Sequence, residues 1–201
     1  MLALPVFPLP RVLVPSELVL VHVFEKRYLQ MLDELADDRF GIVLIREGSE
    51  IGSGATYHDV GTIARIAESR KTEDGRCVLA MVGEQRFEVI DRLAESPYPS
   101  ALVEVLDEGP SEDCSEILEL VSRRLRRYLV VSAESGHGGD VLFQLSSEPA
   151  TASYQVASLL RLLSPERQDL LELPTARSRL EREERLLERE VDLLERVMGV
   201  S

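Results

Sequence analysis

The sequence predicts an α+β protein with a strand-rich first half that contains one inserted helix, followed by an α-helical second half. From Leu2 to about Glu108, short apolar or alternating segments are separated by Gly-, Ser- and Asp-containing turns, which is typical of successive strands. From Ser111 onward, apolar residues recur every three or four positions, which is typical of amphipathic helices. We therefore expect a small closed or nearly closed β-barrel at 1–110 and an α-helical bundle at 111–201.

The opening segment, LPVFPLPRVLVP, carries Pro5, Pro8 and Pro10 among large apolar residues. Each proline ring restricts φ and removes a backbone donor, so this segment is expected to be extended and to exclude both a helix and a central strand. We expect it to cross an apolar surface at the edge of the sheet.

The next three elements are predicted from their apolar patterns. Leu18–Val23 (LVLVHV) is a continuous apolar run that predicts a strand buried on both faces, with His22 in the core. A helix is expected from Glu25 to about Ala36, with Tyr28, Met31, Leu32 and Leu35 on one apolar stripe. Phe40–Ile45 predicts a second buried strand, ended by a Gly/Ser-rich loop.

A hairpin is expected between the segments 60–69 and 76–82, because Glu73-Asp74-Gly75 between them tolerates positive φ. The segment 83–93 alternates charged and apolar residues, which indicates a half-exposed strand. Tyr98–Leu106 is expected to be the last strand.

Four helices are expected in the second half, at 117–131, 149–163, from Ser164, and from Pro174 to about Met198. The last helix has an apolar stripe that we expect to pack within the helical half, with self-association or docking of a partner as the alternative. Glu184 interrupts that stripe, and the opposite face is dense in Arg and Glu. The stripe consists of Leu180, Leu187, Val191, Leu194 and Met198.

The composition restricts the class of protein. The chain has 201 residues and a net charge of −13, which weighs against nucleic-acid and anionic-membrane partners. No apolar segment approaches a membrane span, and the prolines spoil a signal-peptide pattern, so we expect a cytoplasmic protein. Cys77 and Cys114 are expected to be buried, inert thiols, although their spacing alone leaves a disulfide open.

Motifs for catalysis are missing from the sequence. There is no GxxxxGK[ST] loop for phosphates, no GxSxG elbow and no HExxH or CxxC pair. We therefore expect no enzyme activity, no cofactor and no metal site.

Several motifs occur in the order and spacing found in one family. LPVFPL, VLVP, HVFEKRY, VGTIARI and GEQRFEV, followed by ASLLRLLSPERQDLLEL, resemble the N-terminal substrate-recognition domain of the Lon proteases over roughly residues 2–198. The resemblance implies a PUA-like (pseudouridine-synthase-and-archaeosine-transglycosylase-like) barrel with a helical bundle, and binding of unfolded or tagged polypeptides. The last lysine is Lys71, so no later lysine is available for the family's Ser–Lys dyad.

The resemblance and the residues together suggest a binding surface in the first third of the chain. We expect Phe7, Phe24, Tyr28 and Met31 to form a solvent-accessible apolar groove for polypeptide substrates. In the family motifs, Glu25, Arg27, Gly61 and Arg86 are expected to have structural roles. The resulting hypothesis is a non-catalytic adaptor or chaperone-like holder in protein quality control, with a protease or an ATPase as a further partner.

Two alternatives stay open. An RNA-binding barrel protein is suggested by Arg123, Arg124, Arg126 and Arg127, although their stems are expected to cover a core of Leu125, Tyr128 and Leu129. A small-molecule sensor with a pocket at the barrel mouth rests on analogy of fold alone.

Overall fold

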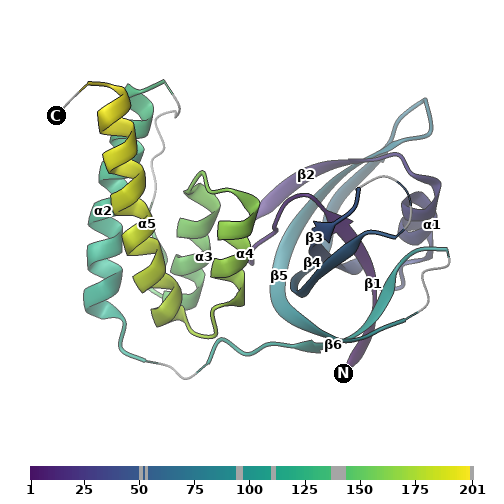
Figure 1. Ribbon diagram of the computed structural model, residues 1–201. Coiled ribbons are helices and arrows are strands. Elements are labelled where there is room, and N and C mark those ends of the chain that lie inside the picture. The colour runs from purple at the N-terminus through teal and green to yellow at the C-terminus, as the bar shows by residue number, and fades with distance from the viewer. Residues whose placement is uncertain (50–51, 53, 94–96, 110–111, 137–143, 200–201) are drawn as a thin grey trace. The chain divides into compact units, whose positions relative to one another are not determined.

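The computed structural model describes residues 1–49, 52, 54–93, 97–109, 112–136 and 144–199. They form six strands and five helices, so the predicted mixed α+β class is confirmed (Figure 1). The chain divides into two compact units. One unit comprises Met1–Asp107 with Leu162–Glu172, and the other comprises Glu108–Arg161 with Leu173–Ser201.

The first unit contains one six-stranded sheet in the order β2-β5-β4-β3-β1-β6. Strand β5 also pairs with β6, so it has three partners: β2, β4 and β6. The strands are β1 (Leu2–Leu9), β2 (Leu18–Val23), β3 (Arg39–Glu47), β4 (Thr56–Lys71), β5 (Cys77–Arg92) and β6 (Ser100–Val105). The strands expected from the sequence are all present, but the two expected at 76–82 and 83–93 are one continuous strand.

Strand β1 lies between β3 and β6, so the expectation of an edge position was wrong. It changes partner midway: Leu2–Pro5 pair antiparallel with β6, and Val6–Leu9 pair parallel with β3. Each half of β1 therefore pairs with a neighbouring strand on one side only. A proline whose nitrogen faces the unpaired side removes no hydrogen bond from the sheet. This change of partner explains how prolines are tolerated in the middle of the sheet order.

The hairpin of β4 and β5 forms as predicted, with Lys71 opposite Cys77 and Gly75 at φ +81°. Close backbone approaches explain two glycines in these strands. A Cβ on Gly61 would lie 2.4 Å from the carbonyl oxygen of Ile42, and one on Gly83 would lie 2.3 Å from that of Val14. Glycine is the residue that permits both approaches.

Strand β2 is buried on one face, so the expectation of burial on both faces was wrong. Val19 and Val23 point into the core, whereas Leu18, Leu20 and His22 are exposed. The alternating pattern of buried and exposed residues shows that only one face of β2 meets the core.

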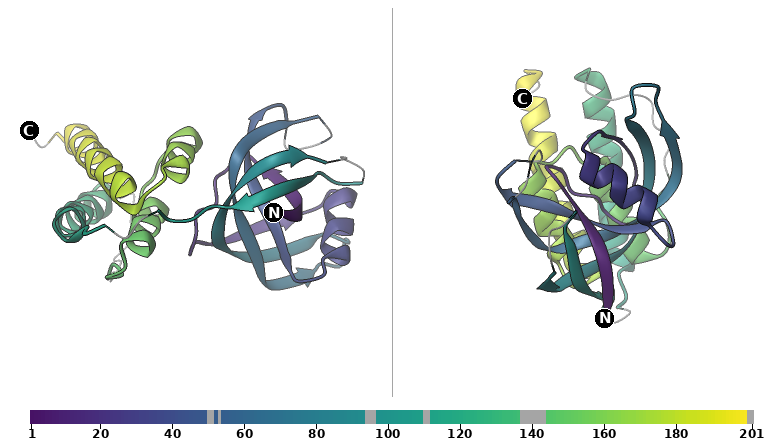
Figure 2. Two further views of the ribbon diagram at one scale, coloured as in Figure 1. Left: turned by 90° about the horizontal axis from the view of Figure 1, so that it is seen from below. Right: turned by 90° about the vertical axis from the view of Figure 1, so that its right-hand side faces the viewer.

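Helix α1 (Lys26–Glu34) lies against the strands of the first unit (Figure 2). Tyr28 and Met31 are buried, and Leu32 and Leu35 pack against the same core cluster, as the predicted stripe requires. The rings of Tyr28 and Phe7 lie 4.2 Å apart, which joins the helix to β1. Burial of this stripe is the main stabilisation of so short a helix.

Helix α4 (Ser164–Glu172) belongs to the first unit. Arg167 forms an ion pair of 2.6 Å with Glu17, and the Gln168 side-chain amide donates to the carbonyl oxygen of Val60. The Ser164 hydroxyl donates to the carbonyl oxygen of Pro10. These polar contacts attach α4 to the segment before β2 and to β4.

The second unit contains α2 (Ser115–Glu134), α3 (Pro149–Leu159) and α5 (Ala176–Val197). Helix α3 ends four residues earlier than expected. The capping box of Thr175 with Ser178 begins α5, and Leu180 and Leu187 of the predicted stripe are buried. Glu184, which interrupts that stripe, pairs with Arg124 of α2 over 2.6 Å. The acidic residue within the apolar stripe thus has a basic partner on α2.

Candidate functional site

Of the four residues predicted to contact a substrate, one presents its side chain to solvent. Phe24 is 47% exposed, whereas Phe7, Tyr28 and Met31 are buried in the core of the first unit. The expectation that all four are accessible was wrong for these three. Phe7 and Tyr28 stack on each other, and the helix stripe fills the space where a groove was expected.

The space that remains between β1 and α1 is small. A cavity of about 10 Å³ is lined by Pro8, Arg27 and Tyr28 together with Gly52, Gly54 and Pro99. That volume is at the lower limit for one water molecule. Among the residues that the structure describes, the space beside β1 and α1 is thus too small to hold a side chain.

The four residues assigned to structural roles make contacts that support those roles. Glu25 accepts from the Gly52 amide and lies 3.3 Å from Arg27, whose guanidinium stacks over the Tyr28 ring at 4.4 Å. Gly61 permits the close approach of β3 described above. Arg86 is 1% exposed and donates to two backbone carbonyl oxygens.

The structure places a different set of apolar side chains at the surface. Leu18 and Leu20 of β2 are 63% and 65% exposed, and Phe24 follows directly after this strand. The sequence carried a signal for this arrangement that was missed: LVLVHV alternates Leu, Leu and His with three valines. The β-branched valines point inward, and the other set points outward.

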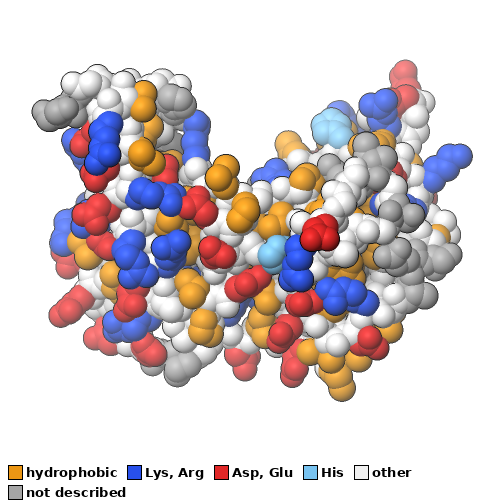
Figure 3. Space-filling view, viewed as in Figure 1, with side chains coloured by type: hydrophobic (Ala, Val, Ile, Leu, Met, Phe, Trp, Pro, Cys, Tyr) orange, Lys and Arg blue, Asp and Glu red, His pale blue; other side chains and the backbone are white. Residues whose placement is uncertain are grey.

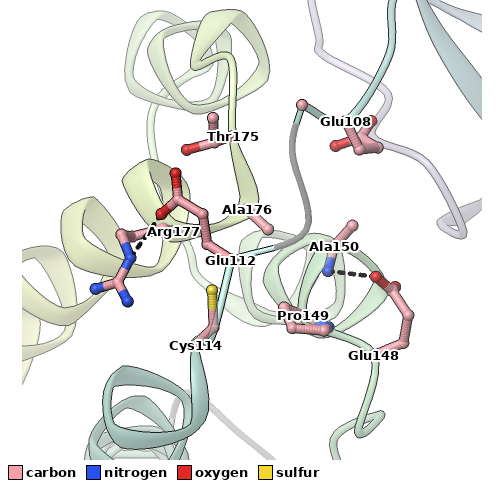
Figure 4. Close-up of a pocket in the computed structure, with 10 residues that line it drawn as sticks. Glu108, Glu112, Cys114, Glu148, Pro149, Ala150, Thr175, Ala176 and Arg177 are labelled. Carbon is pink, nitrogen blue, oxygen red and sulfur yellow. Dashed lines mark hydrogen bonds and ion pairs between the residues drawn. The ribbon is translucent and has the colours of Figure 1, made fainter.

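A polar cavity of about 140 Å³ lies within the helical unit (Figure 4). The N-termini of α2, α3 and α5 surround it, and side chains of the chain already cap those of α3 and α5. Glu148 accepts from the amides of Ala150 and Thr151, and Glu112 pairs with Arg177 over 2.8 Å. These acidic side chains occupy the positions where an anion would bind.

Cys114 contributes the thiol that lines this cavity. It is buried, and burial raises the pKa of its thiol above the usual value. A raised pKa keeps the thiol protonated and weakly nucleophilic near neutral pH. Cys77 is also buried, and both cysteines are free thiols, as predicted. The cavity thus lacks an activated nucleophile.

The arginine cluster of α2 is largely neutralised within the helical unit. Arg123 pairs with Glu119, Arg124 with Glu184 and Glu188, and Arg127 with Glu195. Of the residues expected to form a core beside these arginines, Leu125 and Tyr128 are buried and Leu129 is half-buried. Figure 3 shows basic and acidic side chains intermingled over this part of the surface. Paired arginines make a poor phosphate-binding face.

Among the described residues, none of the helices combines the length and apolar composition that a membrane span requires.

Comparison with known proteins identifies relatives along most of the chain. Residues 3–189 match the family of the ATP-dependent protease La (LON) substrate-binding domain. Lon protease 2 of Herpetosiphon aurantiacus is 32% identical over 96% of this chain and 24% of its own length. Lon protease of Azospirillum brasilense is 25% identical over 95% of this chain. The chain thus spans about a quarter of the length of these curated relatives.

Solved structures agree with this match. A Lon N-terminal domain protein from Xanthomonas campestris is 26% identical, with a TM-score of 0.70 over 90% of this chain and 96% of that one. The N-terminal domain of Mycobacterium avium complex Lon protease, 17% identical with a TM-score of 0.65, has the same fold. From the family match and the fold together, the chain belongs to the LON substrate-binding domain family.

Proposed function

We propose that this chain is a substrate-recognition protein that binds unfolded or tagged polypeptides without chemically changing them. The observation that carries the proposal is the match of residues 3–189 to a family defined by substrate binding. The exposed Leu18, Leu20 and Phe24 support it, because unfolded polypeptides expose apolar side chains that such a surface can bind.

The non-catalytic part of the proposal rests on the chemistry available. The sequence has no phosphate-binding loop of the GxxxxGK[ST] type and no lysine after Lys71. The polar cavity of the helical unit holds a protonated Cys114 and acidic side chains that are already hydrogen-bonded. We infer that bound polypeptides are handed to a protease or ATPase partner or held in an unfolded state, within the cytoplasm.

We also infer that the strands form a PUA-like barrel, which the pairing of β5 with both β4 and β6 supports. We retain 1–110 and 111–201 as the proposed functional parts, a strand part that binds substrate and a helical part.

A binding assay tests the proposed function. The reduced, carboxymethylated form of a small model protein, which cannot refold, is titrated into the chain beside its native form. We expect saturable binding of the unfolded form and at least tenfold weaker binding of the native form. Equal binding of both forms, or binding of neither, contradicts the proposal.

A further inference from the structure

The outer edge of β2 has no partner strand within the described part of the chain. Strand β2 pairs antiparallel with β5 from Leu18 opposite Val82 to Val23 opposite Cys77, and it ends the sheet order. A sheet edge leaves a row of backbone N–H and C=O groups available for another strand. Natural edge strands are usually shielded by charged side chains, prolines or bulges.

The hydrogen-bond pattern shows which residues of β2 face this edge. The Gly83 amide donates to the carbonyl oxygen of Glu17, and the Thr72 amide donates to that of Arg76. Since partners alternate along an antiparallel strand, the odd-numbered residues of β5 from Cys77 to Gly83 bond to β2 and the even-numbered ones bond to β4. The residues of β2 that pair with those odd positions are also odd. The backbone N–H and C=O groups of Leu18, Leu20 and His22 therefore face the free edge of the sheet.

The same three residues carry exposed side chains. Leu18 and Leu20 are 63% and 65% exposed, and His22 is exposed, so apolar side chains line the free edge where shielding charges are usually found. Opposite them on β5 lie Val82, Ala80 and Val78, which are half-buried on the same face. An apolar strip two strands wide therefore ends at an unpaired edge.

We propose that an extended polypeptide segment with apolar side chains at alternate positions adds to β2 as a further strand. The proposal rests on the proposed function and assigns it a surface. Backbone hydrogen bonds to Leu18, Leu20 and His22 would supply affinity largely independent of sequence. The apolar strip would select segments that place leucine, valine or phenylalanine on one face.

Charge indicates the kind of segment that fits. Lys26 and Arg70 are exposed and have no ion-pair partner among the described residues. Lys26 follows β2 closely in sequence, and Arg70 is opposite Val78, which is opposite His22. An acidic residue at this end of the segment would be favoured. A second copy of the chain fits less well, because each copy carries a net charge of −13.

The probe is a soluble fluorescein-labelled peptide of alternating leucine and threonine that ends in two aspartates. Its control has backbone esters in place of the four central amides, which removes strand donors while keeping the side chains. Fluorescence anisotropy is measured with the unaltered chain and with the L18K, L20K and L193K variants. Leu193 of α5 is 47% exposed and is the matched control leucine in the helical unit.

We expect the ester peptide to bind at least tenfold more weakly than the amide peptide, and L18K and L20K to weaken binding at least tenfold. L193K should bind within twofold of the unaltered chain. If the unaltered chain binds carboxymethylated protein but L20K or the esters change nothing, the edge site is overturned while the proposed function stands. If it binds no unfolded protein, the proposed function fails as well. A dimer in sedimentation that L20K dissociates would assign the edge to a second copy and overturn the proposal.

Discussion

The guanidinium of Arg86 in β5 donates to the carbonyl oxygen of Leu171 in α4 over 2.9 Å. A second nitrogen of Arg86 donates to the carbonyl oxygen of Asp107, 3.1 Å away, where the strand part of the first unit ends. One buried side chain thereby connects a central strand, the end of the strand region and a helix that lies 85 residues later in sequence. Arg86 is therefore a buried contact between the two parts of the discontinuous first unit.

We predict that Arg86→Met lowers the free energy of unfolding by about 2–4 kcal/mol, because buried carbonyl oxygens lose a charged donor. Urea denaturation measures the change. Arg76→Ala is the control, since Arg76 pairs with Asp74 at an exposed hairpin and such pairs contribute at most about 1 kcal/mol. Equal effects of the two substitutions would contradict the role assigned to Arg86.

Gly61→Ala is predicted to destabilise the fold more than Gly41→Ala. A Cβ on Gly61 would meet the backbone oxygen of Ile42 at 2.4 Å, whereas a Cβ on Gly41 would meet the Phe87 ring at 2.8 Å. A backbone oxygen moves only with its strand, while a ring can shift. Overpacking typically costs about 1–3 kcal/mol, so we expect Gly61→Ala at or above the top of that range.

Adding Phe87→Leu provides the discriminating control for the two glycines. The smaller side chain should recover most of the stability that Gly41→Ala loses and little of what Gly61→Ala loses, as measured by thermal unfolding. Similar recovery in both backgrounds would show that the ring, and not the backbone of β3, is the obstacle at Gly61.

The elements predicted well from the sequence are those set by local chemistry. The Asp74-Gly75 turn identifies the β4–β5 hairpin because both residues tolerate the required φ, and Gly75 has φ +81°. Likewise, the stripe of Tyr28 and Met31 identifies α1 and its buried face. In each case the residues that decide the structure lie within a few positions of one another.

The features that were not predicted depend on distant parts of the chain. A continuous apolar run does not reveal that β2 ends the sheet order, and the alternation of valine with Leu18 and Leu20 was the one local sign of an exposed face. The grouping of α4 with the strands rests on pairs such as Arg167 with Glu17, 150 residues apart. The groove expected at Phe7 and Tyr28 does not form, because the stiff apolar strand and the amphipathic helix beside it pack against each other as core.

Substitution of Glu183 in α5 is predicted to raise the free energy of unfolding, whereas substitution of Arg86 is predicted to lower it. The Glu183 side chain is fully buried, and neither carboxylate oxygen has a hydrogen-bond partner among the described residues. Burial raises its pKa well above the usual value, although the charge of Arg179 opposes the shift. A pKa that is higher in the folded state means that stability is lost as the pH rises above about 4.5, the unfolded value.

We therefore predict that Glu183→Gln stabilises the chain by about 1–3 kcal/mol at pH 7 and much less at pH 4, where the carboxyl is protonated in both states. Arg179 keeps its partner Glu108 in this variant. Urea unfolding at the two pH values measures the difference. A destabilised variant at pH 7 would show that the Glu183 carboxylate is ionised and compensated in the folded chain.

Glu84 should confer the reverse pH dependence. Arg39 and Arg65 each hydrogen-bond to it over 2.7 Å, and the bond from Arg39 is the main cause of its lowered pKa. A lowered folded pKa gives stability that is present above about pH 4.5 and lost as the pH falls through the folded value. Glu84→Gln should reduce the loss of stability at acid pH by less than about 1 kcal/mol, since the group is partly solvated. An unchanged dependence of stability on pH in the acid range would contradict this assignment.

Substitutions at two phenylalanines separate surface from core in the first third of the chain. Phe7→Ala should lower the free energy of unfolding by about 3–5 kcal/mol, because it opens a cavity beside Tyr28 and Phe40. Phe24→Ser should change stability by less than about 1 kcal/mol, because the side chain is half-exposed. Phe24→Ser should nevertheless weaken binding of carboxymethylated protein several-fold if this side chain contacts the substrate. Binding that stays unchanged while the variant remains folded would remove Phe24 from the recognition surface, leaving the free edge of β2 as the place to look for it.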